Sequence, residues 1–143
     1  MEQVSVWFVL DAYNDFSKYV NWQDTMKYFK LSEFDSPDMV GSGEAMDREF
    51  LSRLDQARSL ADTSFRITSG FRTLEHNKKV GGVENSSHTK GYAADIACTD
   101  SVKRHKIITS LLKAGFTRIG IAKTFIHVDN DPNKPANVTW VYG

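Results

Sequence analysis

The residues best suited to chemistry lie in two short segments, residues 86–95 and residues 125–129. Together these segments supply two histidines, His88 and His127, and one carboxylate, Asp95. Two imidazoles and a carboxylate are ligands that catalytic zinc sites use when they keep a fourth position open for water. The residue types therefore predict a metal centre built from His88, Asp95 and His127.

The first segment is predicted to join a loop to a strand. His88 and Asp95 are seven residues apart, which is too far for neighbouring turns of one helix. We expect Gly91 to supply a backbone turn between them, where a side chain would clash or φ is positive. Residues 92–96 then form a strand that is largely buried on both faces. A charged Asp95 in such a strand needs a partner, and a metal ion is a natural one.

The second segment, residues 125–129, alternates with a period of two. His127 and Asp129 therefore share one face of the predicted strand, while Ile126 and Val128 share the other. This strand can present an imidazole and a carboxylate to the same point.

Three motifs, in the expected order, resemble those of the D-Ala-D-Ala metallopeptidases. Residues 86–95 match the S-x-H-x-x-G-x-A-x-D pattern, residues 69–73 are similar to S-G-[FY]-R-[ST], and residues 125–129 are similar to F-I-H-V-D. This family includes bacterial zinc D-Ala-D-Ala carboxypeptidases and phage L-alanyl-D-glutamate endolysins, and it shares a fold with hedgehog signalling domains. The resemblance covers roughly residues 26–142.

The resemblance implies a zinc peptidase that hydrolyses peptidoglycan stem peptides, either as a carboxypeptidase or as an endopeptidase. One Zn²⁺ per chain would be held by His88, Asp95 and His127 and would activate water. The resemblance also places Arg72 and Ser86 in the substrate site. The fixed guanidinium of Arg72 suits a substrate carboxylate or the developing oxyanion, which makes Arg72 a candidate catalytic residue as well.

The general base is where the chain departs from many relatives. They carry an Asp or Glu three residues before the second histidine ligand, and this chain has Thr124 there. Asp129 shares a face with His127 and is our candidate for the base. The alternative is that Asp129 orients the His127 imidazole, a common arrangement at zinc sites. Glu75 and Glu84, on predicted loops, are further candidates.

The sequence is also compatible with a function of another class, a binding protein. The hedgehog relatives show that the fold can keep zinc and serve in recognition, and Thr124 stands where an acid is often found. The chain could therefore be a non-catalytic, zinc-containing module that binds cell-wall peptides.

Composition is that of one ordinary globular domain of 143 residues with 41% hydrophobic residues. Lys plus Arg equals Asp plus Glu at 18 each, so we expect neither a nucleic-acid nor a membrane partner. Cys98 is the single cysteine, which excludes an internal disulfide.

We expect a monomer that has peptidoglycan peptides as its substrate. The apolar residues 4–10 lack a basic cluster before them and are a poor signal peptide, so we expect a cytoplasmic or a phage-encoded protein that is released to the cell wall.

The chain is predicted to contain a peptidase domain over residues 26–143, preceded by an extension over residues 1–25 without catalytic role. Apolar periodicity indicates a helix over residues 46–61 and a second one around residues 107–112, with Gly115 at its end. Short strands are expected at residues 65–69, 92–96, 118–121, 125–129 and 138–142, and residues 77–85 are expected to be a long loop. This order predicts an α+β fold, a small antiparallel sheet flanked by helices.

Overall fold

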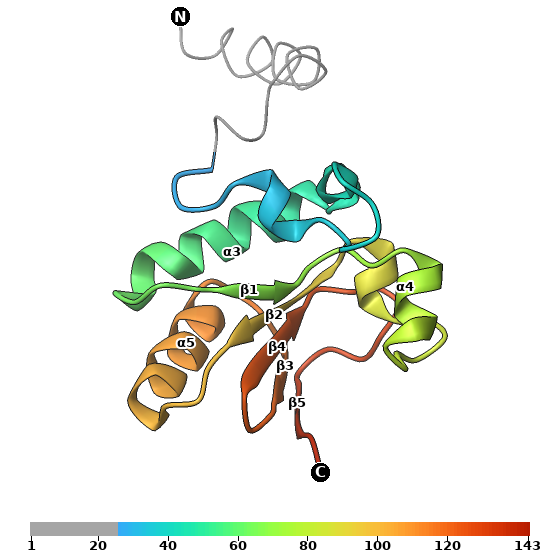
Figure 1. Ribbon diagram of the computed structural model, residues 1–143. Helices are drawn as coiled ribbons and strands as arrows, with labels where there is room; N and C mark the ends of the chain where they lie inside the picture. The colour runs from blue at the N-terminus through green and yellow to red at the C-terminus, as the bar shows by residue number, and fades with distance from the viewer. Residues whose placement is uncertain (1–25) are drawn as a thin grey trace, which may run out of the picture.

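The computed structural model describes residues 26–143, and the extension predicted for residues 1–25 lies outside this part. The described chain forms an α+β domain in which helices and one five-stranded sheet pack together (Figure 1), as predicted. Its α-helices are α3 (Arg48–Ala61), α4 (Leu74–Lys79) and α5 (Ser101–Lys113). Its strands are β1 (Ile67–Ser69), β2 (Ala93–Ala97), β3 (Arg118–Ile121), β4 (Phe125–Asp129) and β5 (Val138–Val141). Three short 3₁₀ helices are η1 (Leu31–Phe34), η2 (Ser42–Ala45) and η3 (Ser87–Lys90).

The two long helices begin at residues that cap them. The Asp47 carboxylate accepts a hydrogen bond from the Phe50 N–H at the start of α3, and Asp100 does the same for Lys103 at the start of α5. Gly115 follows α5 with φ at +95°, in the left-handed region that commonly ends a helix.

No helix within residues 26–143 is both long and apolar enough to cross a membrane.

The strands lie in the order β1-β2-β4-β3-β5. All neighbouring pairs are antiparallel, as predicted, except that β5 runs parallel to β3. Both edges of β4 are already paired, with β2 and with β3. The chain that turns back after β4 therefore pairs with the free edge of β3, and it must then run in the same direction as β3.

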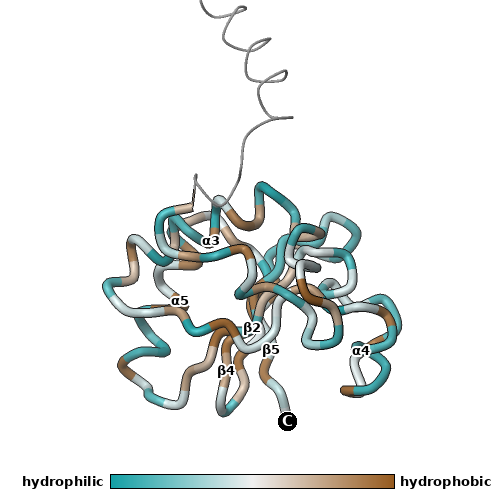
Figure 2. The backbone as a smooth tube through the Cα atoms, turned by 45° about the horizontal axis from the view of Figure 1, so that its top comes forward, coloured by the Kyte–Doolittle hydropathy of each residue, from teal (hydrophilic) through white to brown (hydrophobic). Residues whose placement is uncertain are grey.

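One face of the sheet is apolar and forms the core with α3 and α5. Its fully or almost fully buried side chains include Ala94, Ile96, Ile119, Ile126 and Val128. The apolar residues concentrate in the central strands β2 and β4 (Figure 2). They pack against Phe50, Leu51 and Leu54 of α3 and against Ile107 and Leu111 of α5. The alternation along β4 leaves its other side chains, including His127, for the opposite face.

Helix α4 replaces part of the long loop that we predicted for residues 77–85. The Thr73 hydroxyl accepts a hydrogen bond from the His76 N–H and starts the helix. Asn77 is buried in it, and its side-chain amide donates to the Val83 carbonyl at 2.8 Å. The helix ends before Gly81, whose φ is +74°. The predicted loop was wrong over residues 77–79 because the Thr73 cap was not recognised.

Gly91 is required for the chain to enter β2. Its φ is +80°, and a Cβ at this position would lie 2.3 Å from the Ala45 carbonyl oxygen. Its own carbonyl accepts a hydrogen bond from the Asp47 N–H at 2.9 Å. The turn predicted at Gly91 is thus both left-handed and packed against η2, next to the start of α3.

Replacing Gly91 by alanine is expected to destabilise the fold more than the same change at Gly41. Gly41 has φ at +87°, but a Cβ there meets nothing within 4 Å, so Gly41→Ala costs only the left-handed strain of about 1–2 kcal/mol. Gly91→Ala adds the clash with Ala45, and we expect a further loss of about 1–3 kcal/mol. Urea unfolding measures both variants. Equal losses would show that the close approach at Gly91 carries no energetic weight.

Candidate metal centre

Strand register places the predicted ligands in one row across the sheet. Asp95 of β2 pairs directly with His127 of β4. His127 pairs on its other side with Gly120 of β3, which in turn pairs with Trp140 of β5. Directly paired residues project from the same face of a sheet. The row therefore lies on the face opposite the core.

His88 reaches this row from η3. The Ser86 hydroxyl accepts a hydrogen bond from the His88 N–H and starts the 3₁₀ helix. The His88 Nδ1 lies 2.8 Å from the Gly70 carbonyl oxygen, which can only accept. The Nδ1 therefore carries a proton, and Nε2 is the nitrogen that points into the site. This Nε2 lies 3.3 Å from Asp95 Oδ1.

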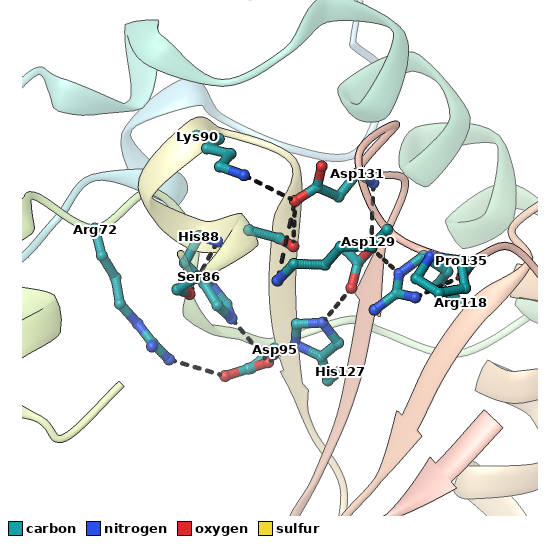
Figure 3. Close-up of polar contacts among 12 residues, drawn as sticks. Arg72, Ser86, His88, Lys90, Asp95, Arg118, His127, Asp129, Asp131 and Pro135 are labelled. Atoms are coloured by element: carbon teal, nitrogen blue, oxygen red, sulfur yellow. Dashed lines mark hydrogen bonds and ion pairs between the residues drawn. The ribbon is translucent and has the colours of Figure 1, made fainter. Parts of the chain in front are cut away.

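His127 is held from both sides by carboxylates. Its Nδ1 lies 2.9 Å from Asp95 Oδ1, and its Nε2 lies 2.7 Å from Asp129 Oδ2. Figure 3 shows the imidazole between these two acids. Because Asp129 accepts from Nε2, Nδ1 is the nitrogen that faces His88 and Asp95. One ligand atom from each of these three residues lies within 4.8 Å of the other two.

The three side chains fit a metal ion. They are only 3–7% exposed, so bulk water has little access to them. Two nitrogens and one carboxylate oxygen suit zinc, and ligands about 2.0–2.2 Å from a tetrahedral ion lie about 3.3–3.6 Å apart. The separations from Asp95 Oδ1, 2.9 Å and 3.3 Å, are somewhat below this range or at its lower end, so the side chains need to move apart only slightly to admit the ion. Within residues 26–143, this is the only group of three potential ligands that meets in this way.

Both carboxylate oxygens of Asp129 already accept hydrogen bonds. Besides His127, its carboxylate accepts from Arg118 Nε at 2.6 Å and from the Asp131 N–H at 3.2 Å. Its exposed fraction is 1%. These contacts correspond to the second role considered for Asp129, that of the acid which orients the His127 imidazole. The other candidate acids, Glu75 and Glu84, are exposed and do not line the cleft beside the site.

Asp131 ties the two histidine-bearing segments together, and the sequence reasoning missed it. Its buried carboxylate accepts from the Ser87 hydroxyl at 2.8 Å, which joins η3 to the chain after β4. The Lys90 ammonium lies 3.7 Å away and Lys134 lies 4.0 Å away. The Asn133 N–H also donates to it at 3.0 Å. The signal available in the sequence was the Asp-Pro-Asn run, whose first residue commonly accepts a backbone hydrogen bond two residues on.

Arg72 lies beside the three ligands. Its guanidinium donates to the Ser69 hydroxyl at 2.9 Å, to the Asn77 side-chain oxygen at 3.2 Å and to Asp95 Oδ2 at 3.4 Å. These contacts fix the guanidinium at the side of Asp95 that faces away from the histidines (Figure 3). Arg72 and Ser86 both line the cleft, so the predicted substrate-site residues are next to the predicted metal ligands.

The cleft has a volume of about 370 Å³. One wall carries Arg72 and Ser86, and the other is aromatic and basic. The Trp140 ring lies 5.4 Å from the His127 ring, and a Cβ on residue 120 would come within 2.6 Å of the Trp140 indole nitrogen. Glycine at position 120 thus leaves the space that the indole fills. The second wall consists of Arg118, Phe125, Lys134, Trp140 and Tyr142.

Without a metal, the site residues strongly perturb one another. Burial acts to raise the pKa of Asp95, but hydrogen bonds with His127 and His88 outweigh it and hold this pKa far below its usual range. Burial acts to lower the pKa of His127, but Asp129 and Asp95 outweigh it and raise this pKa. Bonds from His127 and Arg118 likewise lower the pKa of Asp129 against its burial.

The fold and the buried His–Asp–His group beside a cleft define a candidate metalloenzyme. The family model described as Peptidase M15 matches residues 27–129, and the chain belongs to this family. This membership confirms the resemblance to the D-Ala-D-Ala metallopeptidases and supports a metallopeptidase that acts on peptides. No curated protein matches the chain. The family match ends at Asp129, so Trp140 of β5 and Tyr142, which follows β5, lie beyond it.

The metal-free protein is expected to be most stable between about pH 4 and pH 6.5. Asp95 and Asp129, whose pKa values are lowered, stabilise the fold above about pH 4 and lose this contribution as pH falls. His127, whose pKa is raised, stabilises the fold below about pH 6.5 and loses its contribution as pH rises. Thermal unfolding with a chelator, from pH 3 to pH 9, measures this profile. A metal-free protein that gains stability from pH 6 to pH 8 would contradict it.

Proposed function

We propose that the protein is a zinc-dependent peptidase that hydrolyses peptidoglycan stem peptides. One Zn²⁺ per chain would be held by His88 Nε2, the Asp95 carboxylate and His127 Nδ1. The observation that carries this proposal is the meeting of these three buried ligands at the wall of a cleft, in a chain of the M15 family. When bound, zinc supplies a Lewis acid and lowers the pKa of a coordinated water towards 7.

The residues around the ligands would set their direction and protonation. The Gly70 carbonyl keeps the proton of His88 on Nδ1, and Asp129 keeps that of His127 on Nε2. Arg118 neutralises Asp129 and holds it in place at 2.6 Å. Contacts of this kind keep ligand imidazoles oriented and basic. We therefore assign Asp129 a positioning role rather than that of the general base.

Arg72 and Ser86 would bind the substrate. The guanidinium of Arg72 is held by three neighbours but still lines the cleft, so it can meet a substrate carboxylate or a developing oxyanion at little entropic cost. A terminal carboxylate at this position corresponds to a D-Ala-D-Ala carboxypeptidase, and an internal one to an endopeptidase of the endolysin type. We propose that the protein acts as a monomer, either in the cytoplasm or at the cell wall after release as a phage lysis enzyme.

One observation favours a second candidate, a non-catalytic module that binds cell-wall peptides through the same zinc site. Among the described residues that line the cleft, Asp95 and Asp129 are the only carboxylates, and both are engaged. Thr124 is exposed in the turn between β3 and β4. The two candidates separate on whether purified sacculi are hydrolysed with zinc and spared with a chelator.

Replacing His88 by alanine is expected to abolish both zinc binding and hydrolysis. The zinc content should fall from about one per chain to nearly none, because one of three protein ligands is lost. Elemental analysis and chromatography of the released muropeptides, on the same samples, measure the two effects. His105, exposed on α5, gives the matched control His105→Ala, which should keep both. Zinc retained by the His88 variant would contradict the ligand assignment.

Replacing Asp129 by asparagine separates the two roles considered for this residue. Asparagine cannot satisfy both His127 and Arg118, so a positioning role predicts that zinc affinity falls about 10- to 100-fold. Hydrolysis should then recover substantially when zinc is supplied in excess. Competition with a chelating dye measures the affinity. Unchanged zinc affinity with abolished hydrolysis would show instead that Asp129 is the general base.

A further inference from the structure

The aromatic wall of the cleft is built by residues that lie beyond the family match. Tyr142 follows β5, and its N–H donates to the Ile121 carbonyl at 3.0 Å, so the backbone at this point is tied to β3. The Tyr142 ring lies 5.2 Å from that of Phe125 and 6.4 Å from that of Trp140. These contacts hold the ring against β4 two residues before His127.

Tyr142 is on the same side of the sheet as the proposed ligands. Trp140 lies on the site face beside His127, and side chains two residues apart in a strand share a face. Tyr142 accordingly lines the same cleft as Arg72, Asp95 and His127. The residue is 45% exposed, so a ligand in the cleft can contact it. The indole of Trp140 beside it can only donate a hydrogen bond, so it does not take up the phenolic hydrogen of Tyr142.

We propose that Tyr142 is a catalytic residue whose hydroxyl donates a hydrogen bond to the carbonyl oxygen of the scissile peptide bond. This inference rests on the proposed peptidase function. In the hydrolysis, the oxygen of water bonds to the carbonyl carbon, the C–N bond breaks, and the hydrogens of water end on the new carboxyl group and the amine. Negative charge develops on the carbonyl oxygen on the way, and a fixed donor stabilises it. Tyr142 keeps its proton throughout.

The surroundings of Tyr142 suit a neutral donor. Burial raises the pKa of its hydroxyl, and the carboxylates of Asp95 and Asp129 act in the same direction, so the phenol stays protonated at neutral pH. Each charged donor of the cleft already has a carboxylate neighbour. Arg72 contacts Asp95 at 3.4 Å, Arg118 contacts Asp129 at 2.6 Å, and Lys134 lies 4.0 Å from Asp131. Tyr142 thus has its hydrogen available without breaking an ion pair.

The test compares Tyr142→Phe with Tyr28→Phe in the zinc-loaded protein. Tyr28 packs on α3, against Arg58 and Ser59, and does not line the cleft, so its variant controls for the loss of a hydroxyl as such. We expect Tyr142→Phe to lower kcat on wall peptides about 100-fold while KM, zinc content and Tm stay close to those of the wild type. The Tyr28 variant should match the wild type.

A binding measurement gives a second readout that does not depend on turnover. A phosphinate analogue of the peptide that the wild type cleaves carries a charged oxygen in place of the carbonyl oxygen. Calorimetry should show its Kd raised about 10- to 100-fold by Tyr142→Phe, with little change for the cleaved product. Wild-type kcat and phosphinate affinity in the variant would overturn the proposal. Equal weakening for phosphinate and product, with a lowered Tm, would also overturn it and assign Tyr142 to packing. A wild type that cleaves no wall peptide would instead refute the peptidase function itself.

Discussion

The register between β2 and β4 is the constraint on which the site depends. It places Asp95 opposite His127 and, two residues away, Ala93 opposite Asp129. Because side chains alternate along a strand, a slip of one residue in β4 would turn His127 and Asp129 towards α3 and α5 and expose Ile126 and Val128. The apolar core on the other face therefore fixes the register, and the register fixes the geometry of the ligands.

Buried charge is the cost of this arrangement, and a chain of partners offsets it. Asp95 contacts both histidines and Arg72, Asp129 contacts His127 and Arg118, and Asp131 contacts Ser87 with Lys90 nearby. An uncompensated carboxylate in such positions would be strongly destabilising. The same contacts leave His88 Nε2 and His127 Nδ1 directed at Asp95, so the residues that compensate the charge also orient the proposed zinc ligands.

Local sequence patterns predicted the two central strands, whose structure depends on residues close together in the chain. The alternation of residues 125–129 gave β4, and the apolar run around Asp95 gave β2, while the family membership and the α+β class are confirmed. The zinc ligand roles of His88, Asp95 and His127 stay predictions, although the structure brings the three side chains together.

The features that the sequence did not predict depend mostly on contacts between segments that are distant in the chain. The parallel direction of β5 follows from which strand edge is free after β4, and no pattern within residues 138–142 encodes that. Arg118 and Trp140 gain their importance only because register places them beside Asp129 and His127. Helix α4 was missed for a different reason, since its six residues give too short a period to recognise and only the Thr73 cap marks its start.

Anomalous diffraction at the zinc absorption edge, from crystals of the zinc-loaded protein, tests the ligand set most directly. We expect one strong peak, bonded to His88 Nε2, to an Asp95 carboxylate oxygen and to His127 Nδ1, with distances of about 2.0–2.2 Å. Asp129 should remain on His127 Nε2 and outside the coordination sphere. A peak at another place, or a zinc ion bound through His127 Nε2 or Asp129, would contradict the assigned ligands.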